Sequence, residues 1–263
     1  MDLQIEDKVF MVAASSKGLG YGIARELAKN GATVCIASRT KAEVEKAAEM
    51  LRSETGSTIH ASVFDAADAE SITNWITSVE KAFERIEGLV VNAGGPPPGN
   101  FDDFTDDDWE KAFNLTLMSA VRLIRGVLPA MRTGGGGAIL TVTSMSVKEP
   151  VDRLLLSNVF RSGVTSLVKS LSNELASENI RVNNLLPGRI NTERLQALDQ
   201  NISEKTGISI SEVKQKNEGN IPVGRYGTTE EFGKAGAFLL SPAASYITGV
   251  SLAVDGGSMK TVW

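Results

Sequence analysis

The chain has 263 residues, of which 42% are hydrophobic and 22% are charged, and its formal net charge is −5 at pH 7. This length is enough to bury a sizeable core, and the acidic balance argues against binding to nucleic acid or to a membrane surface. The single cysteine, Cys35, excludes an intrachain disulfide and favours a reducing compartment, so the predicted location is the cytoplasm. Cys35 lies far from the one histidine, His60, so no zinc-type cluster and no metal are predicted.

Apolar runs typical of buried strands alternate with helix-period segments along the whole chain. Seven runs are predicted to be strands: Val9–Ala14, Thr33–Ser38, Thr58–Phe64, Gly88–Gly94, Gly137–Ser144, Ile180–Gly188 and Ser251–Gly257. Their nearly continuous hydrophobicity is typical of strands that are covered on both faces. The alternation predicts an α/β fold with a parallel, doubly wound sheet flanked by helices.

Two helices carry clear local signals. The segment 41–56 places Val44, Ala47, Ala48 and Leu51 at helical spacing and ends at Gly56. The sequence "TDDD", residues 105–108, resembles a capping box that opens a long helix towards "MRTGGGG". Both segments are therefore predicted to be amphipathic helices between strands.

Three further segments bear on domain organisation. The loop Gly94–Gly99 follows the carboxyl end of a strand, where sheets of this kind bind ligands. The polar segment 192–220 is predicted to be an insertion over the ligand crevice, a lid within one domain that spans 1–263. The uncharged run 235–254 has the length of a membrane span, but Ser241-Pro242 and Gly249 divide it into a helix, a turn and a strand. The start of the chain, "MDLQIEDKVF", has no apolar region of the kind found in secretory signals.

The turn "SSKGLG" follows the first strand and opens a helix. Backbone N–H groups and the positive end of a helix dipole bind phosphate at such a turn, and a second strand follows about twenty residues on. The alternative is a tight turn with no ligand. Dinucleotide binding is the preferred interpretation, with these residues as the phosphate loop: Ser15, Ser16, Lys17, Gly18, Leu19 and Gly20.

Six separated motifs resemble the short-chain dehydrogenase/reductase family in order and spacing. They are "AASSKGLG", "VNAG", "FNL" around Asn114, "TVTSMS" around Ser144, "IRVNNLLPGRINT" and "AVDGG". The resemblance covers essentially the whole chain. It implies a Rossmann-type single domain that binds NAD(P)(H) and assembles as a homodimer or homotetramer. The family's Thr-Gly opening is Ala13-Ala14 here, which costs some backbone freedom at the first glycine position.

The residues after the second strand favour NADP(H), with NAD(H) as the alternative. An acidic residue at this strand end would accept hydrogen bonds from the ribose of NAD. This chain instead has Ser38, Arg39 and Thr40, and Arg39 with Lys17 can neutralise a 2′-phosphate. The competing interpretation makes both cations ordinary surface residues. The resemblance also implies contacts to the adenine, the adenosine ribose and the nicotinamide from Asp65, Ala66, Asn92, Ala93, Gly94, Pro187, Gly188, Ile190 and Thr192.

The family uses an Asn, a Ser, a Tyr and a Lys for its chemistry, and this chain departs from that set. Asn114 and Ser144 match the first two positions, but the usual spacing from Ser144 reaches Ser157 in place of Tyr and Arg161 in place of Lys. Arg161 keeps a charge that can hold the nicotinamide ribose, although it does not exchange a proton near neutrality. Ser157 is a far weaker acid than a phenol.

Two sources of the missing proton are considered. Lys148 lies on the loop that edges the substrate pocket, where partial desolvation would lower the pKa of a lysine; the alternative is an exposed lysine paired with Glu149. A water held by Ser157 is the other source. The predicted function is an NADP(H)-dependent oxidoreductase that interconverts a carbonyl and an alcohol, similar to a 3-oxoacyl reductase. The alternative is a catalytically impaired NADP(H)-binding sensor or partner subunit.

Overall fold

Seven parallel strands form one sheet in the order β3-β2-β1-β4-β5-β6-β7 in a computed structural model that describes residues 1–262. The strands are β1 (Val9–Val12), β2 (Thr33–Ser38), β3 (Ile59–Val63), β4 (Gly88–Val91), β5 (Gly137–Val142), β6 (Ile180–Pro187) and β7 (Ser251–Val254). The predicted α/β fold, a Rossmann-type doubly wound sheet, is confirmed. Several strands end up to three residues earlier than predicted, because their last residues already belong to the loops at the carboxyl edge.

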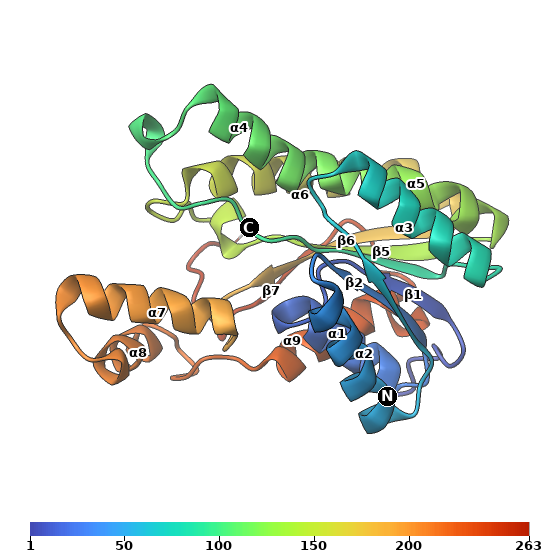
Figure 1. Cartoon of the computed structure of the whole chain (residues 1–263), viewed down its shortest axis with the longest axis horizontal. Coiled ribbons are helices and arrows are strands. Elements are labelled where there is room, and N and C mark those ends of the chain that lie inside the picture. Colours follow the sequence, from blue (N-terminus) through green and yellow to red (C-terminus); the bar gives the residue numbers. More distant parts are fainter. Residues whose placement is uncertain (263) are drawn as a thin grey trace.

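Helices cover both faces of the sheet (Figure 1). They are α1 (Gly18–Lys29), α2 (Lys41–Thr55), α3 (Ala69–Ala82), α4 (Asp106–Phe113), α5 (Ser119–Thr133), α6 (Leu155–Glu174), α7 (Glu193–Thr206), α8 (Ile210–Gly219) and α9 (Thr229–Leu240). Side chains of α1, α2 and α9 share one apolar core with the sheet, and those of α3, α5 and α6 share the other. Two buried layers therefore hold the carboxyl edge of the sheet in a fixed shape.

The predicted helix face of α2 is confirmed. Val44, Ala47, Ala48 and Leu51 are all buried, and Gly56 ends the helix in the left-handed conformation with φ +71°. Glycine pays no Cβ penalty in that conformation.

The predicted capping box is also confirmed, but the long helix it opens is interrupted. The Thr105 side chain accepts from the N–H of Asp108, whose carboxylate accepts from the N–H of Thr105. The helix then passes through one π-helical segment, Asn114–Met118, before α5 begins. Such π-bulges are rare and frequently occur at functional sites.

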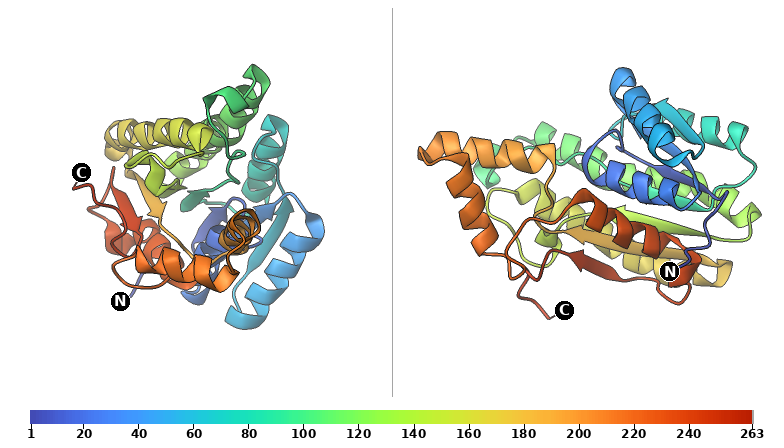
Figure 2. Two further views of the ribbon diagram at one scale, coloured as in Figure 1. Left: turned by 90° about the vertical axis from the view of Figure 1, so that its left-hand side faces the viewer. Right: turned by 90° about the horizontal axis from the view of Figure 1, so that it is seen from below.

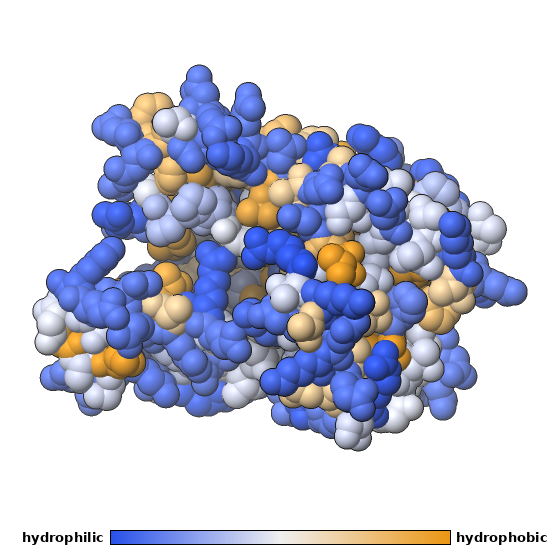
Figure 3. Space-filling model, in the orientation of Figure 1, coloured by the Kyte–Doolittle hydropathy of each residue, from blue (hydrophilic) through white to orange (hydrophobic). Residues whose placement is uncertain are grey.

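The predicted lid segment forms α7 and α8, an arm that extends beyond the carboxyl edge of the sheet (Figure 2). A space-filling view shows a recess between this arm and the part of the molecule that contains α4 (Figure 3). Its role as a lid stays a prediction. The uncharged run 235–254 is divided as expected between α9, the 3₁₀ turn Pro242–Ala244 and β7. Within residues 1–262, no helix combines the length and the apolarity that a membrane crossing needs.

Replacing Ala14 with glycine is expected to stabilise the protein. Ala14 has φ +47°, a left-handed conformation that costs a residue with a Cβ about 1–2 kcal/mol, partly offset by the greater unfolded-state entropy of glycine. We expect Ala14→Gly to raise the free energy of unfolding by about 0.5–1 kcal/mol in urea titrations. The matched control, Ala42→Gly on the exposed side of α2, should lower it by about 1 kcal/mol. Equal losses from both substitutions would contradict the strain at Ala14.

Candidate active site

The turn between β1 and α1 leaves the first turn of a helix open to an anion. Lys17 occupies the N-cap position, but its side chain makes no capping hydrogen bond, and no acidic residue lies in the first turn. The free N–H groups and the helix dipole favour a phosphate there. At Gly20 a Cβ would lie 2.6 Å from the carbonyl oxygen of Ala14, so the close approach requires glycine. The Asn92 Nδ2 donates to that same oxygen at 3.0 Å and fixes the loop to the end of β4.

Two of the predicted phosphate-loop side chains do not face the crevice. Ser15 is fully buried, and its hydroxyl donates to Val12 and accepts from the N–H of Ala37. Its side chain therefore ties β1 to β2, and the prediction that Ser15 belongs to the phosphate loop now concerns its backbone alone. Leu19 packs against the apolar core, so only its backbone is available, whereas Ser16 and Gly18 stay partly exposed.

The two cations expected at a 2′-phosphate, Arg39 and Lys17, differ in whether their charges are already paired. Arg39 is exposed at the end of β2 and has no hydrogen bond or ion pair within residues 1–262. Lys17 instead forms ion pairs with Glu43 of α2 at 3.4 Å and with Glu193 of α7 at 3.2 Å, and both carboxylates raise the pKa of Lys17. Ser38 is buried, and its hydroxyl lacks a partner in the described part of the chain. Arg39 is thus the cation that a phosphate reaches without competition.

The other predicted cofactor contacts lie along the same edge of the sheet. Thr40 precedes α2, and Asp65 and Ala66 follow β3, with the Asp65 carboxylate accepting from the N–H of Ala67. Ala93 and Gly94 follow β4 and line a small pocket. Pro187 ends β6, the N–H of Gly188 bonds to Val254, and Thr192 caps α7. The side chain of Ile190 is buried in the main core, so its predicted contact to the nicotinamide would come from its backbone.

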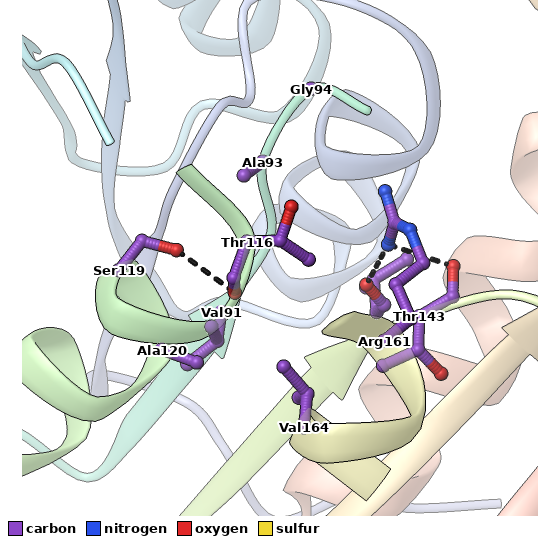
Figure 4. Close-up of a pocket in the computed structure, with 10 residues that line it drawn as sticks. Val91, Ala93, Gly94, Thr116, Ser119, Ala120, Thr143, Arg161 and Val164 are labelled. Atoms are coloured by element: carbon purple, nitrogen blue, oxygen red, sulfur yellow. Dashed lines mark hydrogen bonds between the residues drawn. The ribbon is translucent and has the colours of Figure 1, made fainter. Parts of the chain in front are cut away.

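Arg161 and Ser157 form a tightly held pair one turn apart on α6. The Arg161 Nε donates to the Ser157 Oγ at 3.1 Å. Its Nη1 donates to the carbonyl oxygens of Val142 and Thr143 at 2.9 and 3.0 Å (Figure 4). Burial, and secondly the positive charge of Arg194, lower the pKa of Arg161 to about 10. Because Ser157 accepts from a cation, its own proton is free for donation to another group.

The remaining predicted site residues are spread over the surroundings of this pair. Ser144 ends the loop after β5, and its Oγ accepts from the N–H of Ser146 at 3.1 Å, which leaves the Ser144 proton free. Asn114 opens the π-helical segment, and its side chain bonds to the Glu110 carbonyl and to Arg122.

Lys148 agrees with the alternative interpretation in its exposure but not in its expected partner. Its side chain is exposed, so the desolvation expected to make it an acid is missing. Its expected partner Glu149 instead accepts from the N–H groups of Lys260 and Thr261, at 2.7 and 3.0 Å. The carboxylate therefore holds the C-terminal segment against the substrate loop.

Sequence reasoning missed three groups near the pair. Thr116 in the π-helical segment is buried, lines the pocket beside Arg161, and its hydroxyl has no partner within residues 1–262. Asn184 of β6 accepts at Oδ1 from the hydroxyls of Thr141 and Thr143, which fixes the strand end that Arg161 bonds to. Arg194 of α7 lies directly on Gly95. In the sequence, Arg194 is marked only by its position two residues after Thr192.

Cys35 is buried in β2, in agreement with the buried strand predicted for Thr33–Ser38, and burial raises the pKa of its thiol to about 12. Within residues 1–262, no group of three or more His, Cys, Asp or Glu side chains is arranged to hold a metal ion.

Removing the Tyr226 hydroxyl is expected to loosen the arm. Tyr226 donates to the buried Asp199 of α7 at 2.9 Å, and Asn217 of α8 donates to both of them at 3.0 Å. An unpaired buried acceptor costs about 1–3 kcal/mol, so Tyr226→Phe should speed amide hydrogen exchange in α7 and α8 together but leave α2 unchanged. Tyr246→Phe, at a fully exposed tyrosine, is the matched control. Faster exchange in only one of the two helices would show that they do not form one unit.

Known proteins resemble this chain over nearly its whole length. A family model described as enoyl-(acyl carrier protein) reductase matches residues 13–259. Dehydrogenase/reductase SDR family member 4 of Bos taurus is 32% identical over 257 residues, which cover 97% of this chain and 88% of that protein. L-Sorbose reductase from Gluconobacter frateurii, solved with NADPH and L-sorbose, is 32% identical with a TM-score of 0.96 and full coverage of both chains. A variant of actinorhodin polyketide ketoreductase, solved with NADPH, is 27% identical with a TM-score of 0.92 and covers 97% of this chain and 98% of its own. These matches, together with the sheet order and the phosphate turn, show that the chain belongs to the short-chain dehydrogenase/reductase family of oxidoreductases.

Proposed function

We propose that this protein is an NADP(H)-dependent oxidoreductase that interconverts a carbonyl and an alcohol, similar to a 3-oxoacyl reductase, through an atypical proton path. The observation that carries the proposal is the pair Ser157 and Arg161, which stands where the family has tyrosine and lysine. Both side chains are held at the carboxyl end of β5, beside the loop that contains Ser144. The names of L-sorbose reductase and actinorhodin polyketide ketoreductase, each solved with NADPH, support a carbonyl substrate and this cofactor.

The residues present fit a nicotinamide dinucleotide. The uncapped start of α1 would bind the diphosphate. A Cβ at Gly20 would collide with the carbonyl oxygen of Ala14, so only glycine fits at this point of the turn. Arg39 would pair with a 2′-phosphate, which favours NADP(H) over NAD(H). Lys17 would join it only after leaving Glu43 or Glu193. When bound, the nicotinamide supplies or accepts the hydride. Arg161 would hold its ribose hydroxyls through Nη2, because Nε and Nη1 already donate to Ser157 and to the two carbonyl oxygens.

The proton path begins at the two serine hydroxyls. Ser144 would orient the substrate oxygen, while Ser157 would pass its proton to that oxygen and Arg161 would stabilise the charge left on the Ser157 Oγ. A pocket of about 20 Å³ beside Arg161 has room for one water molecule, and the unpaired Thr116 hydroxyl lies in its wall. Ser157 is not in that wall, so its proton would be returned by a solvent water held by the serine itself. Lys148, exposed on the substrate loop, is the second candidate donor.

One observation favours the alternative, a dinucleotide-binding sensor or partner subunit without turnover. Within the described chain no phenol is available to the site, since Tyr226 is bonded to Asp199, Tyr246 is fully exposed and Tyr21 lies on α1. The segment 192–220 would serve as a lid over a single domain in either case. Assembly as a homodimer or homotetramer and a cytoplasmic location stay predictions.

Turnover and binding measurements separate the two functions. The protein is mixed with NADPH and a panel of ketones, aldehydes and β-ketoacyl thioesters, and the absorbance of the reduced nicotinamide is followed. Turnover that falls in Ser157→Ala and persists in Lys148→Ala supports the serine path, and the reverse result supports the lysine. Tight NADPH binding by calorimetry without turnover supports the sensor. Failure to bind either NADPH or NADH would overturn both.

A further inference from the structure

Glu149 attaches the beginning of the substrate loop, residues 144–150, to another part of the chain. Its Oε1 accepts from the N–H groups of Lys260 and Thr261, at 2.7 and 3.0 Å. In the part of the chain that the structure describes, every other hydrogen bond of residues 144–150 has both partners inside that segment. The hydrogen bonds that join this part of the loop to the rest of the fold therefore depend on one side chain.

The same short segment carries Ser144, whose hydroxyl is proposed to orient the substrate oxygen. The N–H of Ser146 donates to the Ser144 Oγ at 3.1 Å, and the N–H of Glu149 donates to the carbonyl oxygen of Met145 at 3.2 Å. A shift of Glu149 would therefore move the backbone next to Ser144. The buried Ser146 hydroxyl has no partner within residues 1–262, so it does not provide a second attachment.

The C-terminal segment that Glu149 holds, residues 255–261, is itself fixed to the rest of the fold. The Asp255 carboxylate accepts from two N–H groups of this segment, at 2.8 and 2.9 Å, and so closes it into a turn directly after β7. The carbonyl oxygen of Gly256 accepts from the N–H of Val223, which follows the arm, at 3.1 Å. Because the segment is held at its own base, a bond to it can restrain the substrate loop.

We propose that Glu149 is a positioning residue, which holds the substrate loop on the C-terminal segment and thereby fixes the Ser144 hydroxyl in place. The part played by Ser144 rests on the proposed function, whereas the attachment of the loop does not. A carboxylate suits this task, because hydrogen bonds to an ionised acceptor are roughly twice as strong as those between neutral groups. The position of the hydroxyl matters, since a displacement of about 1 Å at a reacting centre can lower a rate about 10²-fold.

Amide hydrogen exchange tests the attachment without any turnover. We expect Glu149→Ala to speed exchange in residues 144–150 and 256–261 together, by about tenfold, and to leave β5 unchanged. Glu149→Gln keeps a carbonyl oxygen as acceptor and should show a smaller increase. Glu87→Ala is the matched control, because Glu87 is also half-buried and accepts from a backbone N–H, that of Val9 at 2.8 Å, at the opposite edge of the sheet. Unchanged exchange at residues 144–150 in Glu149→Ala would refute the proposal.

A double-mutant cycle with Ser144 tests the positioning. In assays with NADPH and the most active member of the carbonyl panel, Glu149→Ala should lower kcat about 10–10²-fold and leave the NADPH affinity in calorimetry unchanged. Glu149→Gln should recover part of this loss. In a Ser144→Ala background the Glu149→Ala substitution should have little further effect, because the group that it positions is gone. Glu87→Ala should keep the normal kcat even where stability falls.

The outcomes separate this proposal from the proposed function. Losses of kcat that multiply in the double variant would show that Glu149 does not act through Ser144. An unaltered protein without turnover on any carbonyl would overturn the proposed function and with it the part played by Ser144. The exchange experiment would then still decide whether Glu149 holds the loop.

Discussion

Replacement of Arg161 with methionine is expected to lower kcat/KM by about 10²–10⁴-fold, the range that a positioned acid–base system contributes. Methionine keeps an unbranched apolar stem but removes the donor to Ser157 and both donors to the Val142 and Thr143 carbonyls. Ser157 then loses the cation that stabilises charge on its oxygen. The expected loss therefore falls mainly on kcat, with a smaller rise in KM from the weaker hold on the ribose.

Two matched variants separate chemistry from stability at this position. Arg161→Lys keeps the charge without the fork, so it should recover part of the rate. Ser157→Ala leaves Arg161 bonded to both carbonyls and should lower kcat by about 10²-fold or more without a large change in the urea midpoint. An Arg161→Met protein that turns over at the normal rate would show that the pair has no part in the proton path. Stability is measured in parallel, because the two carbonyls lose their charged donor.

The fold could be predicted from the sequence because the strand and helix signals are local and repeated. Seven apolar runs gave seven strands, and both the α2 face and the Thr105 capping box lie where their spacing placed them. Strand ends were less certain, since the last residues of a strand in this sheet already turn into ligand loops. The π-helical segment was not foreseen, because no side chain in "NLTLM" marks it.

Sequence motifs assigned candidate residues to the site but did not give the orientation of their side chains. Motif order placed Ser15 and Ile190 at the crevice, but it does not encode the tertiary contacts that bury both side chains in the loops after β1 and β6. Lys148 was expected to be partly desolvated, but its exposure depends on how the loop 145–154 packs, which sequence spacing does not encode. Arg194 was missed for a similar reason. Its approach to Gly95 joins residues about a hundred positions apart, and only the folded chain brings them together.

Gly233→Ala is expected to be among the most destabilising single substitutions in this chain. Helices α1 and α9 cross with their backbones in contact, and a Cβ at Gly233 would lie 2.2 Å from the carbonyl oxygen of Gly22. The contact is mutual, since a Cβ at Gly22 would lie 2.3 Å from the carbonyl oxygen of Thr229. Because the obstructing atoms belong to the backbone, the helices must separate, and the loss should reach about 2–4 kcal/mol of unfolding free energy, as for severe overpacking.

Separation of α1 from α9 would also move the first turn of α1, which forms part of the predicted cofactor site. Cofactor binding should therefore weaken together with stability. We expect Gly233→Ala to weaken NADPH binding as well as to lower the urea midpoint, because residue 233 packs on Gly22, one helical turn after the start of α1. Gly219→Ala is the matched control: it also lies in a helix, has no atom within 4 Å of the added Cβ, and should gain up to about 1 kcal/mol from helix propensity. A Gly233→Ala protein as stable as the unaltered chain would mean that α1 and α9 do not pack backbone to backbone.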